Sequence, residues 1–176
     1  LEDGTLVSTY SGRINDSGSF TESSGVFVST DGGNSWEDRS DPKMTRWTKD
    51  IHISQSSGDW FVGVFSHWGA FPNEVGGLYR SQDQGLTWEV LGDFYRVESC
   101  LEWYGNMYVT TETEGLWYAY NVNVPNPNFN LLTEFPFSHP TRVFMNPYAI
   151  DKLEFWVTSF GSGVWHGYDF SDNTTS

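Results

Sequence analysis

The sequence predicts an all-β protein made of repeated antiparallel units. An eight-residue phrase, S-x-D-x-G-x-[ST]-W, occurs twice, over residues 29–36 and 81–88. Short apolar runs that are typical of strands recur along the chain, and polar or glycine-containing segments separate them. The chain has 18 glycines and 18% aromatic residues, a composition that suits short strands joined by tight turns.

Each copy of the phrase is predicted to form the turn between two strands. The aspartate can accept hydrogen bonds from backbone N–H groups of its own turn, and the glycine two positions later adopts conformations that other residues resist. The tryptophan opens the next strand and offers a large apolar face for packing. We therefore expect structural roles for Ser29, Asp31, Gly33 and Trp36 in the first copy, and for Ser81, Asp83, Gly85 and Trp88 in the second.

The other strands are predicted from apolar runs around four glycines that open similar strands, Gly25, Gly77, Gly115 and Gly163. A second apolar run precedes each glycine, over residues 4–10, 60–66, 106–111 and 154–160. A third precedes three of these, over 47–54, 97–103 and 141–145, and a fourth follows the tryptophan, most clearly over 87–91. The result is about fourteen strands in four units, with approximate limits 1–40, 41–93, 94–134 and 135–176. The first unit lacks its first strand and the last unit lacks its fourth.

The repeated phrase resembles the Asp box, or BNR repeat, of sialidases, xyloglucanase-like glycoside hydrolases and sortilin-type receptors. The last unit, with its Asn146-Pro147 turn and the G-x-G-V-W run over 161–165, is similar to units of the xyloglucanase-like and sortilin-like proteins. The resemblance implies a β-propeller of four-stranded blades, about four of them in this chain. A closed four-bladed ring would need a further first strand. The chain is therefore expected to be a segment of a larger ring, or half of a two-chain ring.

The resemblance also implies where a ligand would bind. In such propellers the loops between the second and third strands of each blade gather on one face around the axis. Aromatic rings beside acidic and basic groups suit oligosaccharides, since a sugar ring can stack on an aromatic face. Trp68, beside His67, is the best candidate of this type, although packing between blades is favoured for it because the chain has nine tryptophans. The expected ligand-binding residues are Tyr10, Arg13, His67, Trp68 and Glu112.

A catalytic role is the alternative to a binding role. Glycoside hydrolysis usually needs two carboxylates that flank the bond, and the candidates are Asp50, Glu112 and Glu114, with Glu98 near the axis as a further one. No motif marks any of them, and an ion pair within its strand would explain Asp50 equally well. We therefore expect a module that binds a carbohydrate or a protein, with a xyloglucanase-like hydrolase completed by a second half as the alternative. A third hypothesis is a scaffold without a ligand of its own.

Charge and composition exclude several other classes. The formal net charge of −14 disfavours nucleic acid as a partner, because phosphate binding needs clusters of basic residues. The four histidines are isolated, so no metal or other cofactor is expected, and the single Cys100 allows no internal disulfide. No apolar run is long enough to span a bilayer. We expect a secreted or periplasmic protein that self-associates, or joins a partner segment, to close its ring.

Overall fold

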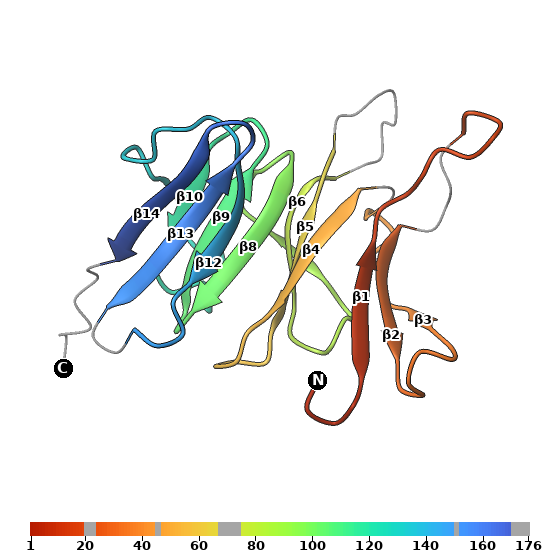
Figure 1. Cartoon of the computed structure of the whole chain (residues 1–176). Coiled ribbons are helices and arrows are strands. Elements are labelled where there is room, and N and C mark those ends of the chain that lie inside the picture. Colours follow the sequence, from red (N-terminus) through yellow and green to blue (C-terminus); the bar gives the residue numbers. More distant parts are fainter. Residues whose placement is uncertain (20–23, 45–46, 67–74, 150–151, 170–176) are drawn as a thin grey trace.

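The computed structural model describes residues 1–19, 24–44, 47–66, 75–149 and 152–169. Over these residues the protein is all-β, without a helix, and fourteen strands form four antiparallel sheets that stand side by side in chain order (Figure 1). In every sheet the strands follow one another in sequence, so each sheet is a simple meander. No helix in the described part of the chain could therefore cross a membrane.

The four sheets correspond to the four predicted units. Sheet 1 holds β1 (Leu6–Tyr10), β2 (Gly25–Ser29) and β3 (Glu37–Asp38). Sheet 2 holds β4 (Thr48–Ile53), β5 (Trp60–Val64), β6 (Gly77–Ser81) and β7 (Glu89–Leu91). Sheet 3 holds β8 (Val97–Trp103), β9 (Asn106–Thr111), β10 (Leu116–Ala119) and β11 (Asn130–Leu131). Sheet 4 holds β12 (Pro140–Met145), β13 (Leu153–Ser159) and β14 (Gly163–Asp169).

The two turns formed by the repeated phrase have the predicted local hydrogen bonds. Asp31 Oδ1 accepts from the backbone N–H of Ser35 at 2.9 Å, and Asp83 Oδ1 accepts from that of Thr87 at 2.8 Å. The second carboxylate oxygen of each aspartate accepts from the hydroxyl of the same residue at 2.6 Å. These bonds favour the ionised carboxylate, and the Ser35 hydroxyl in particular lowers the pKa of Asp31 to about 2. Both aspartates therefore hold their own turns.

Apolar side chains fill the three junctions between successive sheets. Because neighbouring residues of a strand point to opposite faces, a sheet that lies between two others must be apolar on both. Accordingly, every residue of β5 and β6 is buried. Val26 and Val28 of sheet 1 cluster with Trp60, Val62 and Tyr79 of sheet 2, and similar clusters join sheet 2 to sheet 3 and sheet 3 to sheet 4.

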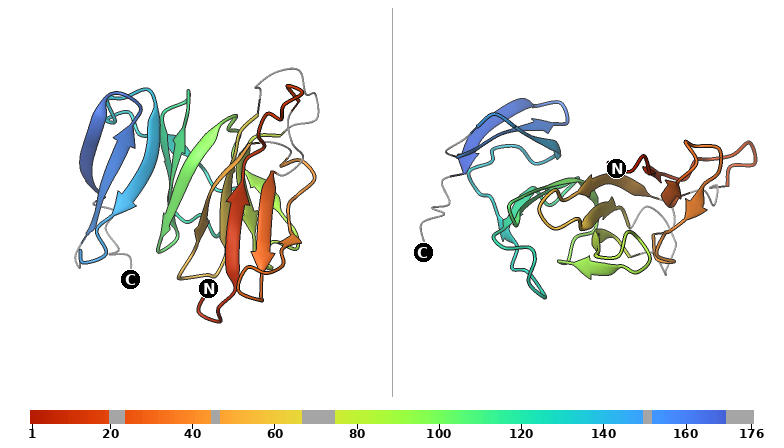
Figure 2. Two further views of the ribbon diagram at one scale, coloured as in Figure 1. Left: turned by 45° about the vertical axis from the view of Figure 1, so that its right-hand side comes forward. Right: turned by 90° about the horizontal axis from the view of Figure 1, so that it is seen from below.

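The row of sheets is open in the described part of the chain. Sheets 1 and 4 lie at opposite ends of it, and the first strands of the other sheets, β4, β8 and β12, run along one side (Figures 1 and 2). β8 contacts both β4 and β12. The three strands together form the surface that carries the candidate site.

Candidate ligand-binding groove

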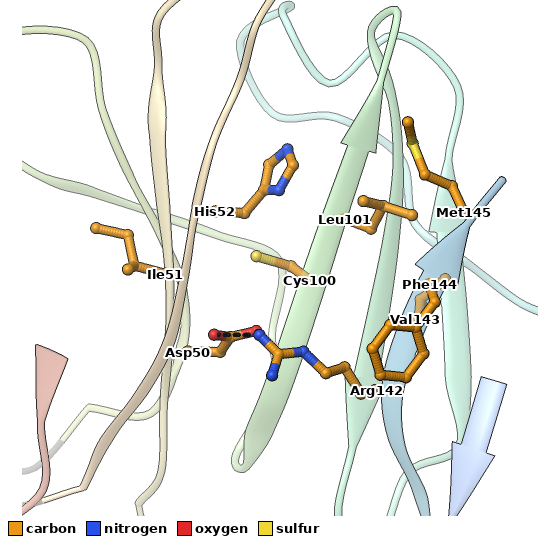
Figure 3. A pocket seen from close by; sticks show the side chains of 9 residues that line it. All are labelled: Asp50, Ile51, His52, Cys100, Leu101, Arg142, Val143, Phe144 and Met145. Atoms are coloured by element: carbon orange, nitrogen blue, oxygen red, sulfur yellow. Dashed lines mark hydrogen bonds and ion pairs between the residues drawn. The ribbon is translucent and has the colours of Figure 1, made fainter. Parts of the chain in front are cut away.

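Two adjacent cavities lie between the inner strands β4, β8 and β12, and we call them together the inner-strand groove. The first has a volume of about 280 Å³, and Figure 3 shows its lining: Asp50, Ile51, His52, Cys100, Leu101, Arg142, Val143, Phe144 and Met145. The second has a volume of about 390 Å³ and lies where the three strands end. It is lined by His52, Gln55, Ser56, Leu101, Glu102, Trp103, Tyr104 and Met145.

Each inner strand has an irregular register near its start. The pairing shifts between Thr48 and Ile51 in β4, between Val97 and Ser99 in β8, and between Pro140 and Arg142 in β12. A bulge of this kind bends the strand and changes the direction of nearby side chains. The residues at the three bulges are Lys49 and Asp50, Glu98, and Thr141. The bulges thus gather charged groups at one end of the groove.

An ion pair crosses the groove at its first cavity. Nη2 of Arg142, on β12, donates to both carboxylate oxygens of Asp50, on β4, at 2.9 and 2.8 Å. The ion pair passes across β8 near Cys100 (Figure 3). Burial raises the pKa of Asp50, and the positive charge of Arg142 opposes this shift. Burial also raises the pKa of Cys100, so its thiol is a poor nucleophile.

A second charged group lies at the bulge of β8. Glu98 is 3.5 Å from Nζ of Lys49 through one oxygen and 3.5 Å from Nε2 of His139 through the other. Lys49 also places its ammonium 4.3 Å from the centre of the Phe65 ring. Glu98 is therefore placed between two basic side chains from neighbouring sheets.

His52 lines both cavities, and its Nε2 atom is buried without a hydrogen-bond partner among the described residues. Burial lowers the pKa of His52, and the negative charges of Glu102 and Asp50 oppose the shift. The imidazole is therefore favoured in its neutral form, in which Nε2 can donate or accept a hydrogen bond. A buried polar atom without a partner, beside an open cavity, suits a ligand with polar groups.

Aromatic side chains border the second cavity. Trp103 and Tyr104 meet edge to face, with ring centres 4.8 Å apart, and Tyr104 is 75% exposed. The buried Glu102 holds their turn, because its Oε1 accepts from the backbone N–H of Gly105 at 2.5 Å and from the hydroxyl of Ser56 at 3.1 Å. Tyr104 has a φ of +48°, a conformation that needs such local support. Glu102 thus positions the exposed Tyr104 and the partly buried Trp103 beside the cavity.

The carboxylates predicted as catalytic candidates all have protein partners. Asp50 pairs with Arg142, Glu112 pairs with Arg96, and Glu114 Oε2 accepts from the backbone N–H of Tyr95 at 3.0 Å. The described lining of the groove contains two carboxylates, Asp50 and Glu102, and both are engaged. Ion pairs and turn contacts therefore account for these side chains.

Of the residues predicted to bind a ligand on the loops, the structure brings Tyr10 and Arg13 together. Tyr10 is the exposed last residue of β1, and the guanidinium of Arg13 lies 5.6 Å from the centre of its ring. Glu112 follows β9 and pairs with Arg96. His67 and Trp68 lie outside the described residues.

Sequence reasoning missed His52, Trp103 and Tyr104. His52 and Asp50 are two positions apart on β4, and this alternation is a signal that both face the same side. For the aromatic pair, the Tyr104-Gly105 turn between two predicted strands was the available signal.

The sheets and the groove define a class, an all-β repeat protein whose meander sheets stand in a row. Comparison of the chain with models of known protein families gives no match, and comparison with curated proteins gives none either.

Proposed function

We propose that the chain is a ligand-binding module of the Asp-box β-propeller class, and that it binds an oligosaccharide in the inner-strand groove. The observation that carries the proposal is the second cavity, where the exposed Tyr104 and the partly buried Trp103 lie in the same lining as His52. Nε2 of His52 has no hydrogen-bond partner among the described residues. Aromatic faces beside polar hydrogen-bonding groups are what a sugar ring with hydroxyls requires.

The propeller assignment is supported by the repeats. Two turns share the same hydrogen bonds to their aspartates, and four meander sheets are stacked in chain order with β4, β8 and β12 on one side. In a propeller such strands surround the axis, and a groove between them faces the central channel. The loop residues Tyr10, Arg13, His67, Trp68 and Glu112 remain predicted contacts of the same ligand or of a protein.

Binding is favoured over hydrolysis because the described carboxylates of the groove are occupied. Asp50 is held by Arg142, and Glu102 is buried against its own turn. A glycosidase needs one carboxyl group that gives a proton and another that attacks or activates water. A hydrolase of xyloglucanase-like type would therefore need a second half to provide a free acid.

A glycan array followed by titration of variants tests the proposal. Tyr104→Asn removes the ring but retains a residue that tolerates positive φ, and Tyr148→Asn, an exposed tyrosine outside the groove lining, is the matched control. We expect Tyr104→Asn to weaken binding about fivefold and Tyr148→Asn to leave it unchanged, since a stacked ring contributes on the order of 1 kcal/mol. Equal binding by the two variants would mean that the ligand does not bind at Tyr104 in the groove. Hydrolysis of a bound glycan would favour the alternative function, a glycoside hydrolase.

A further inference from the structure

Successive sheets of this protein always meet in the same way. We call the side of a sheet that is turned toward the preceding sheet its front face, and the opposite side its back face. Trp60, Val62, Val64 and Tyr79 belong to the front face of sheet 2 and pack against the back face of sheet 1. The junctions of sheets 2 and 3 and of sheets 3 and 4 repeat this back-to-front arrangement.

The front face of sheet 1 corresponds to the front face of sheet 2, but in sheet 1 this face is exposed. Leu6 pairs with Ser29 as Trp60 pairs with Ser81, so the two sheets correspond residue by residue. Leu6 is 43% exposed, whereas its counterpart Trp60 is 1% exposed. The other apolar positions of this front face are Tyr10, Phe27 and Trp36, which correspond to Val64, Tyr79 and Trp88.

The two Asp-box tryptophans show what the open face lacks. Trp88 Nε1 donates to Gly85 O within its own turn, at 3.1 Å, and also to Arg39 O of the preceding sheet, at 2.8 Å. Trp36 Nε1 donates to Gly33 O, at 3.2 Å, and the indole is 45% exposed. Trp88 is therefore covered by Arg39 of the preceding sheet. A sheet packed on the front face of sheet 1 would cover Trp36 in the same way.

Sheet 4 has the complementary open surface, its back face. Val164 follows Gly163 as Leu78 follows Gly77 and as Leu116 follows Gly115. Leu78 and Leu116 are completely buried, whereas Val164 is 60% exposed. Phe144, Trp156 and His166 form one row across the three strands on the same face, with Trp156 stacked on His166 at a ring-centre distance of 5.1 Å. An aromatic row of this kind is suited to packing against another sheet.

We propose that a second copy of this chain covers both surfaces, with the back face of sheet 4 in one copy packed on the front face of sheet 1 in the other. Each internal junction already joins a back face to a front face, so the contact continues an interface that the chain forms three times. Two such contacts, related by a two-fold axis, close a ring of two copies. The proposal depends on the sheets alone and is independent of the ligand.

The molecular mass in solution, measured by light scattering at several concentrations, tests the pairing. We expect the unchanged chain to have twice its mass of 20.0 kDa. Leu6→Lys places a charge on the front face, Val164→Lys places one on the back face, and Leu86→Lys, at an exposed leucine of the sheet 2 turn, is the matched control. Both face variants should halve the mass, and the control should not.

Three results would overturn the pairing. The unchanged chain could remain a monomer at micromolar concentration, or either face variant could retain the double mass, which would indicate a symmetric contact through the other face alone. A mass that keeps rising with concentration would indicate an open filament in place of the two-copy ring. The substituted side chains are exposed, and an unchanged near-ultraviolet circular dichroism spectrum will verify that each variant is folded.

Discussion

The indole N–H of Trp88 donates a hydrogen bond to the backbone carbonyl of Arg39 at 2.8 Å and so joins sheet 2 to sheet 1. Arg39 returns the contact, because its Nη1 donates to Gln84 O at 2.9 Å in the turn that ends with Trp88. The second copy of the repeated turn, in sheet 2, is therefore hydrogen-bonded to the residue that follows the last strand of sheet 1.

Replacing Trp88 with phenylalanine should lower the free energy of unfolding by about 1–2 kcal/mol, because the contact between the sheets and the bond within the turn are both lost. Trp36→Phe removes the bond within the turn alone and should cost less, about 0.5 kcal/mol. Urea denaturation of the two variants measures the difference. Equal losses would mean that the contact with Arg39 contributes nothing to stability.

The Asp31 turn should be sensitive to acid. Because the pKa of Asp31 is lowered from 3.8 to about 2 in the folded protein, the unfolded chain takes up this proton more readily. Its stabilising effect is complete above pH 3.8 and is lost as the pH falls toward 2. Asp31→Asn should therefore flatten this part of the stability curve, as followed by the denaturation midpoint between pH 2 and about 5. An unchanged slope in the variant would contradict the role of the carboxylate.

The pKa of His52 should be lowered on folding, whereas the pKa of a histidine that gains an acidic partner is raised. Its folded pKa lies below the ordinary value of 6.5, since burial favours the neutral ring. The resulting stability is complete above pH 6.5 and is lost as the pH falls below that value. NMR titration of the imidazole gives the pKa directly, and His52→Gln should remove the corresponding loss of stability. A measured pKa of 6.5 or higher would show that the charges of Glu102 and Asp50 outweigh burial.

Removing the Glu102 carboxylate should loosen the turn beside the second cavity. Glu102→Ala leaves the backbone N–H of Gly105 and the hydroxyl of Ser56 without their acceptor, at a cost of about 1–3 kcal/mol. Glu134→Ala is the control, since Glu134 is exposed. Thermal unfolding measures the cost, and hydrogen exchange at Gly105 should become faster in the first variant alone. Equal melting temperatures would indicate that the turn forms without the carboxylate.

Strand positions could be predicted because they depend on short-range patterns. Alternating apolar residues and turn-forming glycines locate the fourteen strands, and they also indicate that sheet 1 has no strand before β1 and that sheet 4 has none after β14 in the described residues. The hydrogen bonds of Asp31 and Asp83 within their turns could likewise be predicted, since they link residues four positions apart.

The groove could not be predicted, because it depends on contacts between residues far apart in the chain. Asp50 and Arg142 are 92 positions apart, and Ser56 and Glu102 are 46 apart. The bulges that direct Asp50 and Glu98 into this region depend on how β4 and β8 pair with their neighbours, which local patterns do not specify.

Trp36 and Trp88 show the difference between what the local sequence determines and what the tertiary structure determines. By itself, the sequence determined that both residues end the same phrase and close the same kind of turn, because the hydrogen bonds involved are local. Only the tertiary structure decided that Trp88 is packed against Arg39 while Trp36 is exposed. The physical reason is that burial depends on which sheet lies opposite, and an identical local sequence carries no information about that neighbour.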